Sequence, residues 1–438
     1  MKPKGLLVGV ALLAVLAGLT WWSNKKQAAA SKSTTDTTTT KILAIPGDQV
    51  QDILIKKPTE TVEVHREAGN TWKLTQPQAL PADVDAASSL VTTLGTLNAE
   101  TVVDAKATDL TPYGLQSPTL DVQISEKNGK TDRLLIGDET PTGSGNYAKL
   151  ANDARVFTVG SYAKTNIDKS PNDLRDKRLL TFDSDKLTRV DLQAKGETIE
   201  FGKNNQNEWQ ILKPRPLRAD GSQVDTLINA LKDARMDLAE DSQKAAAAFA
   251  SAPKVGTATV TDANGTQSLE VHKDKTNNYY AKSSAVAGIY KVTGDIGKSL
   301  EKGANDFRSK KLFEFGFSDP SYLEVQGVGY SKAGSDWTSG TKKMDNATVQ
   351  TLIDKLRDLT ASTFEAEPGQ EKVFEATVVS NQGKRTEKVT VTKEGSKYFA
   401  KRQDDPSIYG LEASAVDDLK KAASDVKEAA PPAPSKKK

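Results

Sequence analysis

The clearest structural signal in the chain is the segment Asn207-Glu208-Trp209-Gln210-Ile211-Leu212-Lys213-Pro214, which is followed by Arg218-Ala219-Asp220. After this aspartate, apolar residues recur at intervals of three and four, a spacing that places them on one face of an α-helix. The tryptophan lies in a short alternating run, which indicates a β-strand. The segment therefore predicts a strand, a turn and an amphipathic helix. The apolar helix positions are Val224, Leu227, Ile228 and Leu231.

This strand, turn and helix unit occurs three times along the chain. In each copy a tryptophan precedes an aspartate, and the aspartate stands where a helix N-cap belongs. A short carboxylate can accept the free N–H groups of the first turn, and it complements the positive end of the helix dipole. We expect the aspartates to cap helices rather than to catalyse, and the tryptophans to anchor cores rather than to stack on a ligand. The tryptophans are Trp72, Trp209 and Trp337, and the aspartates are Asp83, Asp220 and Asp345.

The repeats are large enough to be separate modules. Successive tryptophans lie about 130 residues apart, and a unit of that size can bury its own core. Alternating runs flank a turn-forming pair in every copy, which predicts a hairpin at Asn128-Gly129, Asn264-Gly265 and Gln382-Gly383. The predicted fold class is α+β, with three tandem modules that each contain an antiparallel sheet and one or two covering helices. We place the modules at residues 41–178, 179–311 and 312–428.

Composition excludes several kinds of chemistry. The 438 residues include 60 Lys plus Arg and 58 Asp plus Glu, for a net charge of +2. This balance provides no general attraction to nucleic acid, and we expect no nucleic-acid partner. The absence of cysteine excludes disulfides, thiolate metal sites and a cysteine nucleophile. His65 and His272, the only histidines, lie in alternating runs that predict exposed strand positions rather than metal ligands.

The N-terminus carries a candidate membrane anchor. Residues 1–4 form a short basic head, and residues 5–22, from Gly5 to Trp22, form an uncharged apolar run. A bilayer span takes about twenty residues, with a minimum near seventeen, and tryptophans suit the headgroup interface. The alternative is a cleaved signal peptide with a small-residue site at Ala28-Ala29-Ala30. We favour an uncleaved, single-pass anchor in the inner membrane.

The remaining terminal segments differ in composition from the modules. Residues 23–40 are rich in Ser and Thr and predict a flexible linker, while residues 429–438 form a Pro/Lys tail that we expect to be disordered. Positive charge is nearly balanced on the two sides of the apolar run, so the orientation depends on the short head and long following chain. We expect the bulk of the chain to be extracytoplasmic.

No catalytic signature stands out. The chain lacks a phosphate-binding loop, a His-Glu-x-x-His motif and a Gly-x-Ser-x-Gly motif. The glycines at 143 and 145 match a nucleotide fingerprint by spacing, but they lead into a strand-like segment rather than a helix. We therefore predict a non-catalytic protein without a cofactor or a metal.

Two basic clusters recur where one module ends and the next begins. A solvated linker is the simpler interpretation of such a cluster. The functional alternative is a contact with anions, either lipid headgroups or an acidic partner. The first cluster contains Arg175, Lys177 and Arg178, and the second contains Arg308, Lys310 and Lys311.

Three features together resemble a bacterial family known only as domain of unknown function 4340 (DUF4340). They are the anchor that ends in Trp21-Trp22-Ser23-Asn24-Lys25-Lys26, the element Tyr113-Gly114-Leu115 and the repeated tryptophan–aspartate unit. The resemblance implies a membrane-anchored or exported protein, often encoded beside ABC-transporter permease and ATPase components and gliding-type auxiliary proteins. It supplies no catalytic residues. The second and third copies lack the Tyr-Gly-Leu element at the matching place.

Two functions from different classes remain open. The first is an accessory or scaffold subunit that binds protein partners, such as an ABC-type permease or an auxiliary subunit of that complex. The second is an extracytoplasmic protein that binds a glycan or a small ligand in a groove between modules. An enzyme of unrecognised type is a third and weaker alternative, because no catalytic constellation is recognisable.

Overall fold

The computed structural model describes residues 40–316 and 320–430. The described residues form two compact units, the first ending at Lys177 and the second beginning at Arg178. The first unit contains module 1, and the second contains modules 2 and 3. The predicted anchor at 5–22, the head at 1–4 and nearly all of the predicted linker and tail lie outside the described residues. Within the described ranges, no helix is long and apolar enough to cross a membrane.

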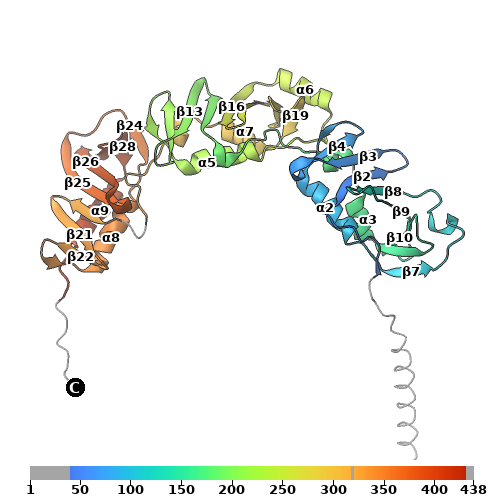
Figure 1. The fold of residues 1–438 in the computed structure, drawn as a ribbon. Helices are drawn as coiled ribbons and strands as arrows, with labels where there is room; N and C mark the ends of the chain where they lie inside the picture. Colours follow the sequence, from blue (N-terminus) through green and yellow to red (C-terminus); the bar gives the residue numbers. More distant parts are fainter. Residues whose placement is uncertain (1–39, 317–319, 431–438) are drawn as a thin grey trace, which may run out of the picture. The chain divides into compact units, whose positions relative to one another are not determined.

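Module 1 is built on one antiparallel sheet with the strand order β5-β4-β3-β2-β8-β9-β10-β11-β7 (Figure 1). A short strand pair, β1 with β6, lies apart from this sheet. The strands are β1 (Thr40–Lys41), β2 (Val50–Lys56), β3 (Thr61–Arg66), β4 (Trp72–Gln76), β5 (Leu80–Pro81), β6 (Asn98–Ala99), β7 (Thr101–Asp104), β8 (Leu120–Glu126), β9 (Thr131–Glu139), β10 (Gly145–Leu150) and β11 (Val156–Gly160). The helices are α2 (Val84–Gly95), α3 (Ser161–Ile167) and α4 (Pro171–Leu174).

Module 2 repeats this topology with the strand order β15-β14-β13-β12-β16-β17-β18-β19. The strands are β12 (Arg189–Ala194), β13 (Glu197–Lys203), β14 (Trp209–Lys213), β15 (Leu217–Arg218), β16 (Lys254–Asp262), β17 (Gly265–Lys273), β18 (Tyr279–Ser283) and β19 (Ile289–Val292). The helices are α5 (Gly221–Lys232), α6 (Ser242–Ser251) and α7 (Gly294–Leu300).

Module 3 has the strand order β23-β22-β21-β20-β25-β26-β27-β28-β24, again antiparallel throughout. The strands are β20 (Tyr322–Val325), β21 (Val328–Ala333), β22 (Asp336–Ser339), β23 (Lys342–Lys343), β24 (Thr363–Glu365), β25 (Glu371–Ser380), β26 (Arg385–Glu394), β27 (Lys397–Arg402) and β28 (Ile408–Leu411). The helices are α8 (Asn346–Arg357) and α9 (Ala413–Ser424).

The sheets form because their strands alternate between buried and exposed positions. Along β8, every second side chain from Leu120 to Glu126 is buried. This period of two gives each strand one apolar face, which the helices cover. The predicted hairpin turns connect β8 to β9, β16 to β17 and β25 to β26. The prediction of α+β modules with antiparallel sheets is confirmed.

The repeated helix covers the core in each module. In α5, the buried residues are the four that the spacing predicts: Val224, Leu227, Ile228 and Leu231. Helices α2 and α8 bury the corresponding positions. Each of these helices packs beside a later helix of its module, in the pairs α2 with α3, α5 with α7 and α8 with α9 (Figure 1).

Modules 1 and 2 depart from the prediction of one or two helices, because each contains three. In module 2 the additional helix, α6, covers a second face of the sheet. Tyr279 belongs to the main core, whereas the next residue, Tyr280, packs with Ala245 and Phe249 of α6. Adjacent residues of a strand point to opposite faces, so β18 is covered on both sides. The sequence places an Ala-rich segment here but does not show that its partner is the far face of the sheet.

Candidate functional site

The repeat tryptophans and aspartates have structural roles in three separate modules. Trp72, Trp209 and Trp337 are buried, each in the core of its own module. Each aspartate is an N-cap whose carboxylate accepts backbone N–H groups, at 2.9 and 3.0 Å for Asp83 and at 3.2 Å for Asp220. Asp345 caps α8 in the same way. The structure does not bring these residues together into one site.

Each repeat aspartate also fastens the end of its module through its own backbone. The N–H of Asp83 donates to Leu174 O at 2.8 Å, and the N–H of Asp220 donates to Phe307 O at 2.7 Å. The N–H of Asp345 donates to Lys427 O at 2.9 Å. Each module therefore closes by pairing its last segment with the residues that precede the cap.

In module 3 this pairing continues into the predicted tail. Ala429 donates its N–H to Lys343 O at 2.9 Å. The expectation of disorder from residue 429 onwards is therefore wrong at its first residue, because backbone pairing with β23 extends the folded part. Residues 431–438 lie outside the described residues.

The first basic cluster takes part in backbone pairing on either side of the unit boundary. Arg175 forms a β-bridge with Ala82 in the first unit, and Arg178 forms one with Arg235 in the second. The side chain of Lys177 is half-buried. Neither arginine stands in an unstructured, fully solvated linker.

The second basic cluster lies in the connector between modules 2 and 3, residues 308–314, and this connector is paired on both sides. Arg308 forms a β-bridge with Ala219, which belongs to module 2. Lys311 forms a β-bridge with Thr360, which belongs to module 3. The N–H of Ala361 also donates to Lys310 O at 2.8 Å. The backbone of the connector is thus paired with both modules.

The expectation of a solvated linker is wrong for Arg308 of this second cluster. Arg308 is only 8% exposed and Ser309 only 4%, while Lys310 and Lys311 are exposed. The physical reason is the pairing on both sides, which removes the connector backbone from water. A run of basic residues predicts a solvated segment. The backbone partners of this run lie in distant parts of the chain, so the local sequence gives no sign of them.

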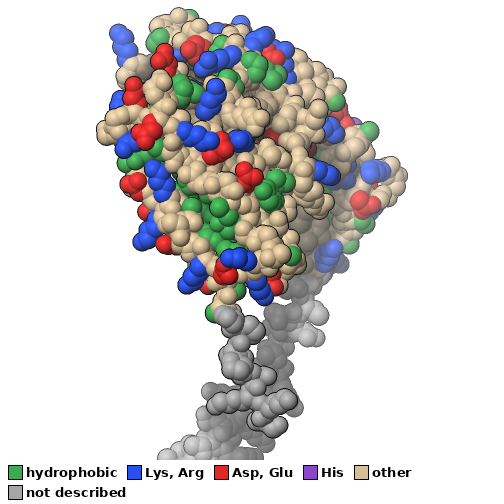
Figure 2. Space-filling model, turned by 90° about the vertical axis from the view of Figure 1, so that its left-hand side faces the viewer, with side chains coloured by type: hydrophobic (Ala, Val, Ile, Leu, Met, Phe, Trp, Pro, Cys, Tyr) green, Lys and Arg blue, Asp and Glu red, His purple; other side chains and the backbone are tan. Residues whose placement is uncertain are grey.

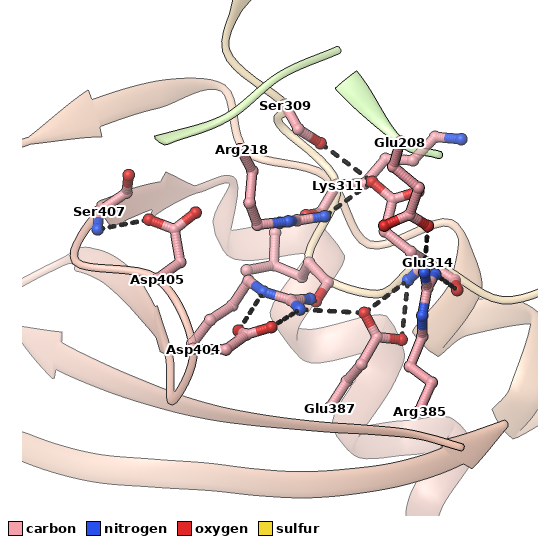
Figure 3. A network of polar contacts seen from close by, with 12 residues as sticks. Glu208, Arg218, Ser309, Lys311, Glu314, Arg385, Glu387, Asp404, Asp405 and Ser407 are labelled. Atoms are coloured by element: carbon pink, nitrogen blue, oxygen red, sulfur yellow. Dashed lines mark hydrogen bonds and ion pairs between the residues drawn. The ribbon is translucent and has the colours of Figure 1, made fainter. Parts of the chain in front are cut away.

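A network of charged side chains surrounds the connector (Figure 3). Arg218 of module 2 donates to Glu314 Oε1 at 2.7 Å and to the carbonyl oxygen of Lys311 at 2.7 Å. Ser309 donates its hydroxyl to the same Glu314 oxygen at 3.2 Å. Arg218 therefore holds the start of module 3 from the side of module 2.

In a second contact between the two modules, the arginine belongs to module 3 and the acceptors belong to module 2. Arg385, at the start of β26, forms an ion pair with Glu208 of module 2 and donates to Gln206 Oε1 at 3.3 Å. Its other terminal nitrogen donates to Glu314 O at 2.7 Å. Arg218 and Arg385 thus bind the connector from the two modules that it joins (Figure 3).

Beneath these contacts lies a buried ion pair of module 3. Arg402 contacts Glu387 at 3.0 Å and Asp404 at 2.7 Å, and it donates to the carbonyl oxygen of Leu312. Glu387 accepts the backbone N–H of Glu314 with both carboxylate oxygens, at 3.1 and 3.0 Å. The buried pair therefore continues directly into the connector.

The network shifts the pKa values of its members. Burial acts to raise the pKa of Glu208, but the hydrogen bonds from Arg385 and Asn204 outweigh it and leave the pKa below its ordinary value. Asp404 behaves likewise, because its bond to Arg402 outweighs burial and lowers its pKa. Burial raises the pKa of Tyr409, whose hydroxyl donates to Asp405, to about 12. The carboxylates thus stay ionised and paired at neutral pH.

A polar cleft of about 650 Å³ opens beside this network. Its lining combines amide side chains, Trp209 and charged residues from both modules. Basic and acidic groups balance each other, and the three arginines that line it all bind carboxylates. The charged lining residues are Lys203, Glu208, Arg218, Asp225, Glu314, Lys384, Arg385, Glu387, Arg402 and Asp404.

The histidines lie apart from this cleft. His65 contacts Asp52 at 2.6 Å on the exposed side of module 1. His272 was expected to be exposed but is half-buried, because α6 stacks Phe249 on its ring at 3.8 Å between centroids. Within the described ranges, no group of three or more His, Asp or Glu residues is arranged to hold a metal ion.

Comparison with known proteins places the chain in one family. No curated protein matches the sequence. A protein-family model described as "Domain of unknown function (DUF4340)" matches residues 72–210 and again residues 209–372. The two matches begin at Trp72 and Trp209, so they follow the repeat that the sequence shows. Together they span well over half of the chain, which belongs to the DUF4340 family.

Proposed function

We propose that this protein is a non-catalytic scaffold subunit that binds protein partners in the cell envelope. Residues 5–22 would anchor it in the inner membrane by a single pass, with the modules on the extracytoplasmic side. The apolar run and the Ser/Thr-rich linker support the anchor. The family resemblance favours an ABC-type permease or an auxiliary subunit of its complex as the partner.

The observation that carries the proposal is the way modules 2 and 3 are joined. A short connector is paired by backbone hydrogen bonds to both modules, and two arginines bind it from opposite sides. Residues fixed by backbone pairing and by paired charges lose little further freedom on binding, which lowers the entropic cost of an interface. A joint of this kind suits a protein that presents two modules as one rigid surface.

The surface charge is compatible with protein partners rather than nucleic acid. Figure 2 shows Lys/Arg and Asp/Glu side chains interspersed over the face in view, with hydrophobic side chains gathered between them. A nucleic-acid interface concentrates basic residues on one face, as a stripe or patch. The mixed pattern and the net charge of +2 favour contacts with other proteins.

The test uses the full-length protein in its own cells. Membranes are washed with alkaline carbonate, and protease is added to cells with an opened outer layer. We expect the chain to stay in the membrane pellet and its modules to be digested from outside. After mild solubilisation, native electrophoresis should show it in a complex larger than itself. A chain that washes off and migrates alone would contradict the proposal.

The second candidate function is binding of a polar ligand, and the cleft beside Arg385 favours it. The cleft is concave, and its lining includes amide side chains and Trp209. However, the arginines in it are occupied by carboxylates of the same chain. A ligand screen by thermal shift would decide between the two. Stabilisation by a glycan fragment or small acid, abolished by Gln210→Ala at the cleft wall, would favour this second function.

A further inference from the structure

Strand β7 is an exposed edge of the module 1 sheet. It stands last in the strand order and pairs with β11 on one side (Figure 1). Among the described residues, no strand pairs with its other side. Val102 and Val103 are 42% and 43% exposed, and they are neighbours on this strand. An edge strand with unpaired backbone groups and exposed apolar side chains is a template for the addition of another strand.

The first described strand, β1, lies along the same open side, just before β7. It pairs with β6 in an antiparallel register, Thr40 with Ala99 and Lys41 with Asn98. Only Glu100 separates β6 from β7, and its N–H donates to Thr158 O of β11 at 2.9 Å. A strand has two hydrogen-bonding edges, and β11 takes one of them. Strand β1 therefore occupies the start of the edge that β7 leaves open.

The register of β1 gives the direction in which the preceding chain meets β7. Continued towards the N-terminus, it brings residue 39 to Glu100, Thr37 to Val102 and residue 35 to Asp104. The chain bends at Glu100, which can shift this register by one residue. Residues 35–39 lie outside the described residues, and their sequence is Thr-Asp-Thr-Thr-Thr. Threonine is β-branched and favoured in strands, so this composition suits an added strand.

We propose that residues 35–39 dock on β7 as an additional antiparallel strand that closes the edge of the module 1 sheet. The added strand would pair with the open backbone groups of β7 and cover part of the side chains of Val102 and Val103. The predicted linker would then have a paired part, residues 35–40, and an unpaired part, residues 23–34. In the anchored protein, the unpaired part alone would separate module 1 from the membrane, with a root-mean-square span of about 20 Å.

The chain's own segment is favoured over a strand from another molecule. Strand β1 already directs this segment along β7. A covalent connection through a short linker also gives an effective concentration in the millimolar range, which a separate molecule has to exceed. The pairing concerns module 1 alone, so it goes beyond the scaffold function and does not depend on it.

The test uses engineered disulfides in the full-length chain, which has no cysteine of its own. Thr37→Cys and Thr38→Cys are each combined with Val102→Cys, because the bend at residue 100 allows two registers. The proximity control combines Thr37→Cys with Asn152→Cys. Asn152 is exposed in the turn between β10 and β11, next to the small cavity that Ile42 and Val102 line. We expect one of the two Val102 pairs to oxidise roughly tenfold faster than the control, because a paired strand holds only alternate residues on one face.

Hydrogen exchange provides a second measurement that needs no cysteine. Replacing both Thr37 and Thr38 with proline removes two adjacent backbone N–H groups, one of which must face β7. We expect this double change to reduce the protection of the β7 amides from exchange. The matched control is the same double change at Ala29 and Ala30, in the unpaired part, and it should leave the protection unaltered.

Four results would overturn the inference. Both Val102 pairs could oxidise no faster than the control, or the prolines at 37 and 38 could leave the β7 amides as protected as before. Disulfides between two chains through Val102→Cys alone would assign the edge to a second copy. Protection of β7 only in native membranes would assign it to a partner's strand. The larger membrane complex is measured separately, so failure of the pairing is distinct from failure of the scaffold function.

Discussion

Arg402 and Glu387 form an ion pair of 3.0 Å in which the two side chains are only 2% and 3% exposed. Both residues also bind the connector, Arg402 through Leu312 O and Glu387 through the N–H of Glu314. Glu387 depends on this pair, since without Arg402 its buried carboxylate would have neither water nor a counter-ion, whereas Arg402 also contacts Asp404. The pair links the core of module 3 to the segment that arrives from module 2.

Removing one member of this pair should strongly destabilise the second unit. For Arg402→Met we expect a loss of about 3–5 kcal/mol, because Glu387 would remain buried without its cation. Urea unfolding followed by tryptophan fluorescence measures this, since Trp209 and Trp337 both report on the second unit. Glu371→Gln, at an exposed position of β25, is the control. Equal midpoints for the two variants would refute the role of the pair.

The contact between Arg385 and Glu208 should behave as a modest and specific coupling between modules. Both side chains are partly exposed, so the pair is worth about 1 kcal/mol or less. Arg385→Glu should lower the thermal midpoint, and adding Glu208→Arg should restore part of it. A double-mutant cycle isolates the coupling. If the two changes are additive at low salt, the contact does not join the modules.

The cap aspartates should stabilise their helices individually. For Asp220→Ala we expect a loss of about 1 kcal/mol, because the N–H of Gln223 loses its side-chain acceptor and keeps only the backbone oxygen of residue 220. Asp220→Asn keeps an acceptor oxygen and should restore most of the stability. Thermal unfolding of the three proteins checks this. A loss for the asparagine variant as large as for alanine would point to charge rather than capping.

The joint should weaken in acid. Glu208 and Asp404 have folded-state pKa values below their ordinary values of 4.5 and 3.8. A lowered folded pKa means that the stabilisation is complete above the unfolded pKa and is lost as pH falls through the folded value. We therefore expect these ion pairs to stabilise the joint fully at pH 6, and this stabilisation to be lost progressively as the pH falls below the ordinary pKa values of the two carboxylates.

Hydrogen exchange of one amide in the connector and of one amide that pairs with it measures this loss directly. The amide of Glu314 lies in the connector, and the amide of Ala361 donates to the connector at Lys310 O. Protection of both amides from exchange should fall as the pH is lowered below 4.5, after correction for intrinsic exchange rates. Glu208→Gln serves as the comparison, because it removes one of the titrating groups and should flatten part of the pH dependence. Unchanged protection across this range would show that these ion pairs do not hold the joint.

Much of the fold follows from local patterns. The helix after Asp220 buries the residues that its spacing predicts, and the three turn-forming pairs connect the strands that alternation predicts. Such signals depend on neighbours within a few residues, where helix and strand periods are set. The repeat itself made the modules recognisable, and the family match begins on its tryptophans.

The joint could not be predicted, because its contacts join distant residues. Arg218 and Glu314 are 96 residues apart in sequence, and Arg385 and Glu208 are 177 apart. No residue near Arg308 in the sequence indicates that it is buried. Likewise, no residue near His272 in the sequence indicates that Phe249 stacks on its ring. The net charge is nearly balanced, and it gives no information about which individual charges form ion pairs. Only the folded arrangement shows which basic residues are compensated.

The most direct test of the scaffold function is photo-crosslinking in living cells. A photoreactive amino acid replaces Lys310 at the connector or Lys298 on α7 in the full-length chain, and crosslinked products are identified by mass spectrometry. The scaffold account predicts that the connector position yields one reproducible envelope protein and that the α7 position does not. Products limited to this chain itself, at both positions, would contradict it.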